Sequence, residues 1–247
     1  MRKLGLFIVA LIIGGIAFTA CDINDNTSSG EKGRINIHIT DAPFPIELIA
    51  STSVTIDKVE IRKRSEEDST EFILLSEEEM VIDLMELTNG ITEQLASAEL
   101  EAGNYDLIRL HVVDATVTLN SGLDFDLKIP SGSASGLKVK IQPEFYLEEG
   151  QTSDILLDFD VSRSFVVKGS LNNIKGFNFK PVVRGVYMGA AGRIEGNVTD
   201  TSGVVLEDAM IKAWLSNIAF GDSIDYVSSF SDELGDYKII GLVEGNI

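Results

Sequence analysis

The chain contains 247 residues, of which 44% are hydrophobic and 24% are charged, and its formal net charge is −19 at pH 7. At roughly 150 residues per domain, this length fits a medium domain followed by a small one. The composition excludes a chain that is disordered throughout, and the negative charge excludes nucleic acid as a partner. One cysteine and two histidines exclude an intrachain disulfide and a zinc site made without carboxylates.

Residues 1–20 are typical of a secretory signal. A basic start, Met1-Arg2-Lys3, precedes an uncharged run over residues 4–18, which is shorter than the roughly 20 apolar residues of a membrane-spanning helix. The sequence Phe-Thr-Ala-Cys at residues 18–21 resembles the lipobox of bacterial lipoproteins. We therefore expect Cys21 to be lipidated and to become the mature N-terminus, with ordinary cleavage after Ala17 as the alternative.

The segment that follows Cys21 predicts how the protein is attached. Residues 21–33 are polar and rich in Ser, Asn, Asp and Gly, as in a flexible tether. Several acyl chains on one cysteine anchor a protein stably, whereas the negative charge disfavours adhesion to anionic lipids. We expect an extracytoplasmic protein that is held to a bacterial membrane by its N-terminal lipid.

From Arg34 onward the apolar residues alternate with polar ones, which indicates strands with one buried face. The first such run places Ile35, Ile37 and Ile39 on one side. Further short runs are separated by turn signals such as those at residues 120–122 and 130–132. The pattern predicts an all-β fold, specifically an antiparallel Greek-key β-sandwich.

One segment departs from this alternation. Residues 88–98 begin with a Thr or Asn that could cap a helix, and then place Ile91, Leu95 and Ala98 at helical spacing. We expect one short helix here that covers an open end of the sandwich.

Small residues at 189–192 then break the strand pattern and predict a boundary between domains at 34–188 and 189–247. Six motifs of the first domain occur in order: Ile39–Pro43, Val54–Ile61, Asp83–Gly90, Ala102–Leu110, Leu157–Asp160 and Lys180–Arg184. With these motifs the first domain resembles the prokaryotic domain of unknown function 4382, which is found in secreted and lipid-anchored proteins. The resemblance implies no assigned activity.

The second domain resembles the regulatory-like domain of carboxypeptidases, a small transthyretin-like β-sandwich. Residues 192–200 are similar to its first strand and turn, and residues 231–239 to its central hairpin. The strands that normally follow are not present before Ile247, so we expect a partial domain. The resemblance is to an accessory domain without zinc ligands and implies no peptidase activity, and carbohydrate binding in some relatives is only an analogy of fold.

The sequence offers few candidates for catalysis. His38 and His111 both fall among the outward-facing residues of their strands, and no nucleophile or metal-binding motif accompanies them. We therefore interpret both as surface histidines.

Two pairs of aspartates are more distinctive. Asp124 and Asp126 flank a phenylalanine, as do Asp158 and Asp160, so each pair is expected to project from the solvated face of its strand. Adjacent like charges need neutralising, and calcium is one candidate. We favour ion pairs with basic residues of neighbouring strands, and Lys138, Lys140 and Arg109 are the candidate partners.

The single tryptophan, Trp214, shares its strand parity with Lys212 and is a candidate ligand-binding residue. An outward indole could stack on a sugar or anchor a partner protein. The alternative, which we favour because exposed tryptophan is uncommon, is that it packs against the preceding domain or under strands that this chain lacks.

Together these features predict a non-catalytic, lipid-anchored protein of the cell envelope that binds or scaffolds, with a glycan or an envelope protein as its partner. No cofactor is expected beyond the calcium alternative. A second hypothesis is a glycan hydrolase that uses a carboxylate pair, which would need one carboxyl group with a raised pKa. A third is a structural spacer for a larger C-terminal module.

Overall fold

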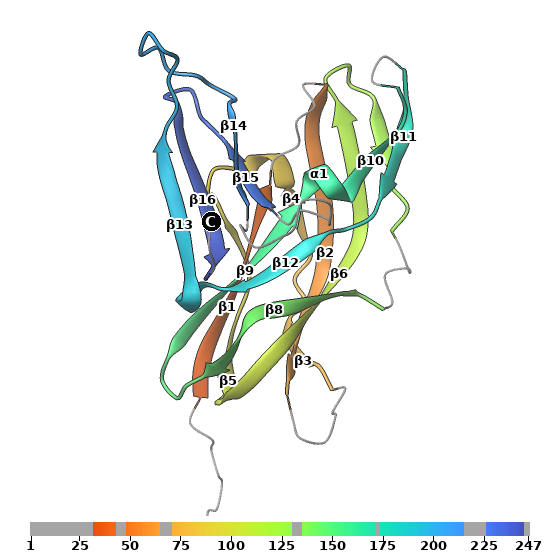
Figure 1. The fold of residues 1–247 in the computed structure, drawn as a ribbon. Coiled ribbons are helices and arrows are strands. Elements are labelled where there is room, and N and C mark those ends of the chain that lie inside the picture. The colour runs from red at the N-terminus through yellow and green to blue at the C-terminus, as the bar shows by residue number, and fades with distance from the viewer. Residues whose placement is uncertain are drawn as a thin grey trace, which may run out of the picture.

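The computed structural model describes residues 32–42, 48–64, 71–129, 135–170, 173–214 and 226–244. These residues form mostly strands, which confirms the all-β prediction (Figure 1). The predicted signal, Cys21 and the tether up to residue 31 lie outside the described residues. Within the described part of the chain, no helix is long and apolar enough to cross a membrane.

The described residues before 188 form twelve strands, and we call them the N-terminal unit. They are β1 (Lys32–Ala42), β2 (Ile49–Lys63), β3 (Ile73–Ser76), β4 (Met80–Asp83), β5 (Glu93–Glu101), β6 (Gly103–Leu119), β7 (Asp124–Asp126), β8 (Leu137–Leu147), β9 (Thr152–Asp160), β10 (Phe165–Ser170), β11 (Asn173–Phe179) and β12 (Val183–Tyr187).

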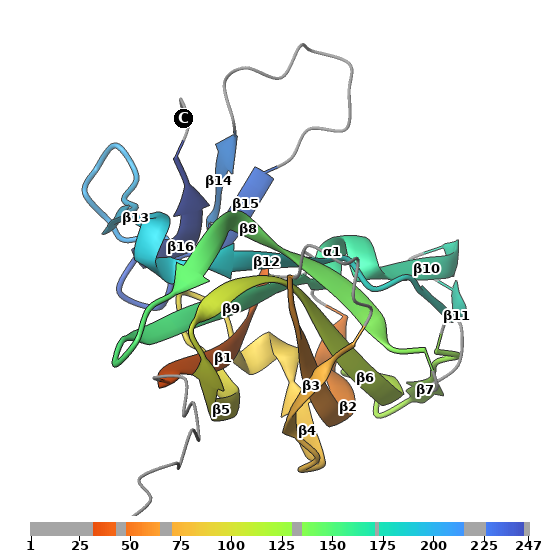
Figure 2. The same cartoon turned by 90° about the horizontal axis from the view of Figure 1, so that it is seen from below.

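Ten of these strands form one sheet in the order β3-β2-β6-β8-β12-β9-β1-β5, with β4 beside β2 and β7 beside β6. The end strands β3 and β5 approach each other, so the sheet curls into a sandwich that is nearly a barrel (Figure 2). Most neighbours are antiparallel, as predicted, but β1 pairs with β9 and β12 pairs with β8 in parallel. The sheet is therefore mixed. Strands joined as a hairpin must be antiparallel, but these partners are far apart in sequence and can pair in parallel.

The core of the N-terminal unit fills the inside of this curved sheet. Ile35, Ile37 and Ile39 of β1 are completely buried there, as their alternation predicts. The rings of Phe159 and Phe179 stack in the same core, with centroids 6.2 Å apart. The hairpin of β10 and β11 thereby extends the core beyond the main sheet.

The helix predicted for residues 88–98 is wrong. The segment instead follows a 3-10 turn, η1 (Leu84–Glu86), bends at Asn89 and Gly90, which have positive φ angles, and becomes β5. Strand pairing with β1 overrides the helical spacing, leaving Leu95 buried and Ile91 exposed. The α-helix that the structure contains is α1 (Val161–Ser164), a single turn after β9.

A second turn, η2 (Met188–Ala190), leads into the C-terminal unit, which consists of β13 (Ala191–Asn197), β14 (Met210–Trp214), β15 (Tyr226–Phe230) and β16 (Asp236–Val243). In it β13 pairs with β16 and β14 pairs with β15. This unit packs on the outer face of β9 and β12, where Figure 1 shows β16 beside them. Leu156 and Val186 on that face are buried, although they lie outside the main core cluster.

Candidate functional site

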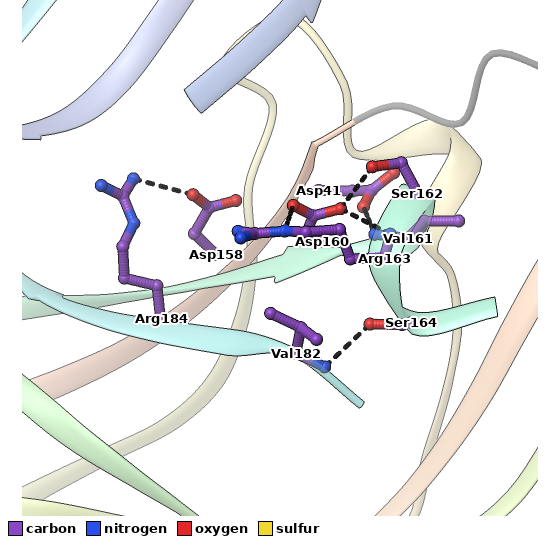
Figure 3. A network of polar contacts seen from close by, with 9 residues as sticks. All are labelled: Asp41, Asp158, Asp160, Val161, Ser162, Arg163, Ser164, Val182 and Arg184. Carbon is purple, nitrogen blue, oxygen red and sulfur yellow. Dashed lines mark hydrogen bonds and ion pairs between the residues drawn. The ribbon is translucent and has the colours of Figure 1, made fainter. Parts of the chain in front are cut away.

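Three motif segments meet where β1, β9 and β12 run side by side. The parallel register places Thr40 opposite Asp158, and the antiparallel register places Arg184 of β12 opposite the same aspartate. Figure 3 shows that the acidic side chains of β1 and β9 and the arginines gather at this point. We call the cluster of Asp41, Asp158, Asp160, Arg163 and Arg184 the motif cluster.

An ion pair lies at one side of the motif cluster. Arg184 Nη2 is 2.8 Å from Asp158 Oδ2, and the aspartate is only 7% exposed. Burial raises the pKa of Asp158 above its usual value, although the positive charge of Arg184 and its hydrogen bond act in the opposite direction. The carboxyl group is thus desolvated and retains a charged partner.

Asp160 and Asp41 fix the turn that follows β9. Asp160 caps α1 by accepting hydrogen bonds from Ser162 Oγ at 2.7 Å and from the Arg163 backbone N–H at 2.9 Å, and it also pairs with the Arg163 guanidinium. Asp41 Oδ1 accepts from the Val161 backbone N–H at 3.1 Å. Both carboxylates therefore position the backbone of α1 (Figure 3).

The prediction that Asp158 and Asp160 project into solvent is wrong, since they are 7% and 4% exposed. Alternation along the strand indicated the correct face, but α1 and the C-terminal unit cover that face. Both aspartates do form ion pairs, but Asp158 pairs with Arg184 and Asp160 pairs with Arg163. The expected partners were Lys138, Lys140 and Arg109.

The other aspartate pair lies elsewhere, on β7. Asp124 and Asp126 are exposed, and each accepts a hydrogen bond from a threonine of β6: Thr118 Oγ1 lies 2.8 Å from Asp124, and Thr116 Oγ1 lies 3.4 Å from Asp126. The structure does not bring the two pairs together. Within the described ranges, no group of three or more His, Cys, Asp or Glu residues is arranged to hold a metal ion.

The prediction of surface histidines is wrong for His111 and agrees with the partly exposed position of His38. His111 is buried, with Nε2 2.8 Å from Glu60 Oε2, and Arg109 Nη1 lies 3.3 Å from the same oxygen. Burial acts to raise the pKa of Glu60, but the His111 hydrogen bond and the positive charges of Lys58 and Arg109 outweigh it and hold the pKa below its usual value. His38 is partly exposed, with Nε2 3.4 Å from Asp154 Oδ1. Because β1 and β6 are not neighbours in the sheet, the two histidines do not meet.

A hollow of about 630 Å³ opens near the start of β1, between the ends of β2, β5 and β6. Three of its polar residues contact one another: Lys63 Nζ lies 2.9 Å from Glu101 Oε2, and the Tyr105 hydroxyl donates to the Glu101 carbonyl. Burial, together with the charge of Glu101, raises the pKa of Tyr105 to about 12, so this phenol is a poor general base.

Trp214 lies at the end of β14 and is 50% exposed. Met210, on the same face of the strand, is also exposed. Two residues that matter more to the arrangement of the units, Asn89 and Arg184, are not identifiable as site residues from the sequence. Both lie in motif segments, but their partners come from strands that are distant in sequence.

Comparison with known proteins gives one match. The model of the domain of unknown function DUF4382 matches residues 32–181, more than half of the chain. No curated protein and no solved structure matches. Strand β12 lies just beyond the matched range but pairs with β9 and β8, so the N-terminal unit extends slightly further than the match.

We predict that Arg184→Ala lowers the free energy of unfolding by about 3–5 kcal/mol at pH 7, because it leaves the buried Asp158 carboxylate unpaired. A carboxyl group whose pKa is raised on folding stabilises the protein below its unfolded pKa, and this contribution is lost as the pH rises through the folded pKa. The deficit of the variant should therefore shrink as the pH falls from 7 toward 4. Urea unfolding at several pH values measures it.

Arg193→Ala is the matched control, because the ion pair of Arg193 with Glu195 is exposed on the surface. Its stability should stay close to that of the wild type at each pH. A deficit in Arg184→Ala that is the same at pH 7 and pH 4 would contradict the assignment of the effect to an unpaired carboxylate.

Proposed function

The chain belongs to the DUF4382 family, and we propose that it is a non-catalytic scaffold of the bacterial cell envelope, anchored by a lipid on Cys21. In this proposal the N-terminal unit holds the C-terminal unit in a fixed position. One observation carries it: the face of β9 and β12 that contains the motif cluster is covered by the C-terminal unit of the same chain.

The apolar part of this interface supports a fixed position. Leu156 and Val186 face β16, where a Cβ built on Gly241 would lie 3.0 Å from Leu156 Cδ2 and 3.8 Å from Val186 Cγ2. Gly241 has a φ of 70°, so a glycine is needed both for the backbone conformation and for the close approach. Ile239 and Leu242 of β16 are also buried. These contacts remove apolar surface of both units from water.

Asn89 adds a directional contact between the units. Its Nδ2 donates to the Asp236 carbonyl at 3.2 Å, and its Oδ1 accepts from the Lys238 backbone N–H at 2.5 Å. A residue of a parallel neighbouring strand would engage these two backbone groups in the same way. The side chain of Asn89 therefore acts as a one-residue strand partner and sets the register at which β16 lies on the N-terminal unit.

The small space left between the units supports a role without catalysis. The void beside Asp158, Ser228 and Lys238 measures about 10 Å³, roughly enough for one water molecule. A hydrolase would need a carboxylic acid that a substrate can reach. The pKa of Asp158 is raised, as that of a general acid would be, but the carboxyl group is covered and paired with Arg184, which favours a role in packing over acid catalysis.

We assign residues 189–247 to the carboxypeptidase regulatory-like, transthyretin-like class on the motifs of its first strand and central hairpin. The half-exposed Trp214 supports a contact with a glycan or an envelope protein in this unit. The scaffold would present that contact away from the interface between the units.

Asn89→Gly tests the docking contact, because glycine accepts the positive φ of this position but removes both hydrogen bonds. We expect the Lys238 amide to exchange with deuterium about tenfold faster or more, since losing about 1.4 kcal/mol of protection changes the rate by this factor. Amides in the middle of β1 should exchange as in the wild type. Hydrogen exchange read by mass spectrometry or NMR measures both.

Asn178→Gly on β11 is the matched control, since the same substitution there lies outside the interface. Unchanged exchange at Lys238 in Asn89→Gly would mean that this side chain does not hold the C-terminal unit, and the scaffold proposal would lose its directional contact.

Lipid anchoring is tested separately with Cys21→Ser. The thiol of Cys21 is the only one in the chain, so the variant should lose all incorporation of a labelled fatty acid, while Ser29→Ala in the tether should keep it. Labelling of the Cys21→Ser variant at the wild-type level would remove the anchor from the proposed function.

A further inference from the structure

Four large aliphatic side chains are exposed at one end of the C-terminal unit. Val204, Val205 and Leu206 lie between β13 and β14, and Leu234 lies in the turn between β15 and β16, with exposed fractions from 41% to 64%. We call these four residues the apolar tip. Isolated exposed apolar side chains are ordinary, but a group of them on a soluble surface commonly marks an interaction site.

The two segments of the apolar tip lie side by side. Val205 bridges to Thr199, and Leu206 N–H donates to the Val198 carbonyl at 3.0 Å. Val198 N–H donates in turn to the Gly235 carbonyl at 2.8 Å, and a Cβ on Gly235 would lie 3.2 Å from the Val205 Cβ. The two segments that carry the aliphatic side chains are therefore adjacent, with residue 235 against Val205.

Local hydrogen bonds hold both segments in shape. Asp200 Oδ1 accepts from the backbone N–H groups of Ser202 at 2.7 Å and Val204 at 2.9 Å. Asp232 Oδ1 accepts from those of Leu234 and Asp236, each at 2.9 Å. The tip is thus presented on ordered turns, which reduces the entropy lost when a partner binds.

The two segments that carry the apolar tip are acidic and contain no basic residue. Residues 194–211 and 226–237 contain no Lys, Arg or His. The exposed acidic residues in the two turns are Asp200, Glu207, Asp208, Asp232, Glu233 and Asp236. An aliphatic centre with a wholly negative rim is complementary to an aliphatic segment that carries positive charges at its edges.

We infer that the apolar tip is a docking site for a polypeptide segment whose aliphatic side chains are flanked by lysines or arginines. A second copy of this chain would bring the same negative rim against itself, and an anionic membrane would be repelled in the same way. The small size of the tip fits a weak, salt-sensitive complex.

The position of the apolar tip agrees with such a role. Figure 1 shows the connection between β13 and β14 at the opposite end of the molecule from the start of β1. If the lipid anchor of the proposed function precedes β1, the tip lies at the end of the folded part that is remote from the point of attachment. Only this orientation rests on the proposed function, because the chemistry of the tip does not depend on the anchor.

The test uses the full chain in detergent solution and a fluorescein-labelled peptide of alternating lysine and leucine, with binding followed by fluorescence anisotropy. Two matched peptides replace either every lysine by glutamate or every leucine by serine. We expect the lysine–leucine peptide to bind more tightly than either of the others by about tenfold or more, and its affinity to fall as salt rises. Equal binding of the lysine–serine peptide would overturn the proposal, since it would mean attraction to net charge alone.

Variants locate the site on the molecule. Val205→Ser combined with Leu234→Ser should weaken binding of the lysine–leucine peptide by about tenfold or more, because exposed side chains are changed without altering the turns. Glu207→Gln combined with Glu233→Gln should weaken it several-fold at low salt and reduce its dependence on salt.

Each pair of variants has a control on the N-terminal unit. Val81→Ser with Leu123→Ser removes two exposed aliphatic side chains, and Glu77→Gln with Glu78→Gln removes two exposed charges. Both controls should bind the peptide as the wild type does. Wild-type affinity in the tip variants, or an equal loss in the controls, would overturn the assignment, and neither result depends on whether Cys21 carries a lipid.

Discussion

The parallel pairing of β1 with β9 determines which residues meet at the centre of the molecule. It joins segments more than a hundred residues apart and places Thr40 opposite Asp158 in a single register. Because side chains alternate between the two faces of a sheet, a shift of one residue would turn Asp158 and Leu156 into the core and bring Phe159 to the outer face. The motif cluster and the surface on which the C-terminal unit packs both depend on this register.

A buried ion pair such as Asp158–Arg184 adds little net stability, because desolvation opposes the attraction between the charges. Its effect here is to favour one arrangement of the strands over others. The pair is satisfied only when β12 lies beside β9 in the observed register, and it is buried against β16 only when the C-terminal unit is docked. Asn89 adds the same kind of selectivity, since its two hydrogen bonds require the backbone of β16 at residues 236–238.

Much of the fold could be predicted from the sequence because local patterns decide it. The alternation of Ile35, Ile37 and Ile39 correctly identified a buried strand face. Residues 88–98 could not be assigned in this way, since helical spacing and strand pairing compete there and the pairing with β1 is a long-range contact. The same limit applies to Asp158 and His111. Their strand parity indicated a face outside the core, but the C-terminal unit covers Asp158, and His111 is buried beside Glu60 of the neighbouring strand. Neither cause leaves a local signal in the sequence.

Fixed docking of the C-terminal unit on the DUF4382 domain is tested most directly by ¹⁵N relaxation of the backbone amides. Slow overall tumbling is shared by all amides of a rigid body, whereas a unit on a loose linker tumbles faster than the whole. We predict one rotational correlation time for amides in β1, β9 and β12 and for those in β13 and β16. A distinctly shorter effective correlation time for β13 and β16 would contradict the claim.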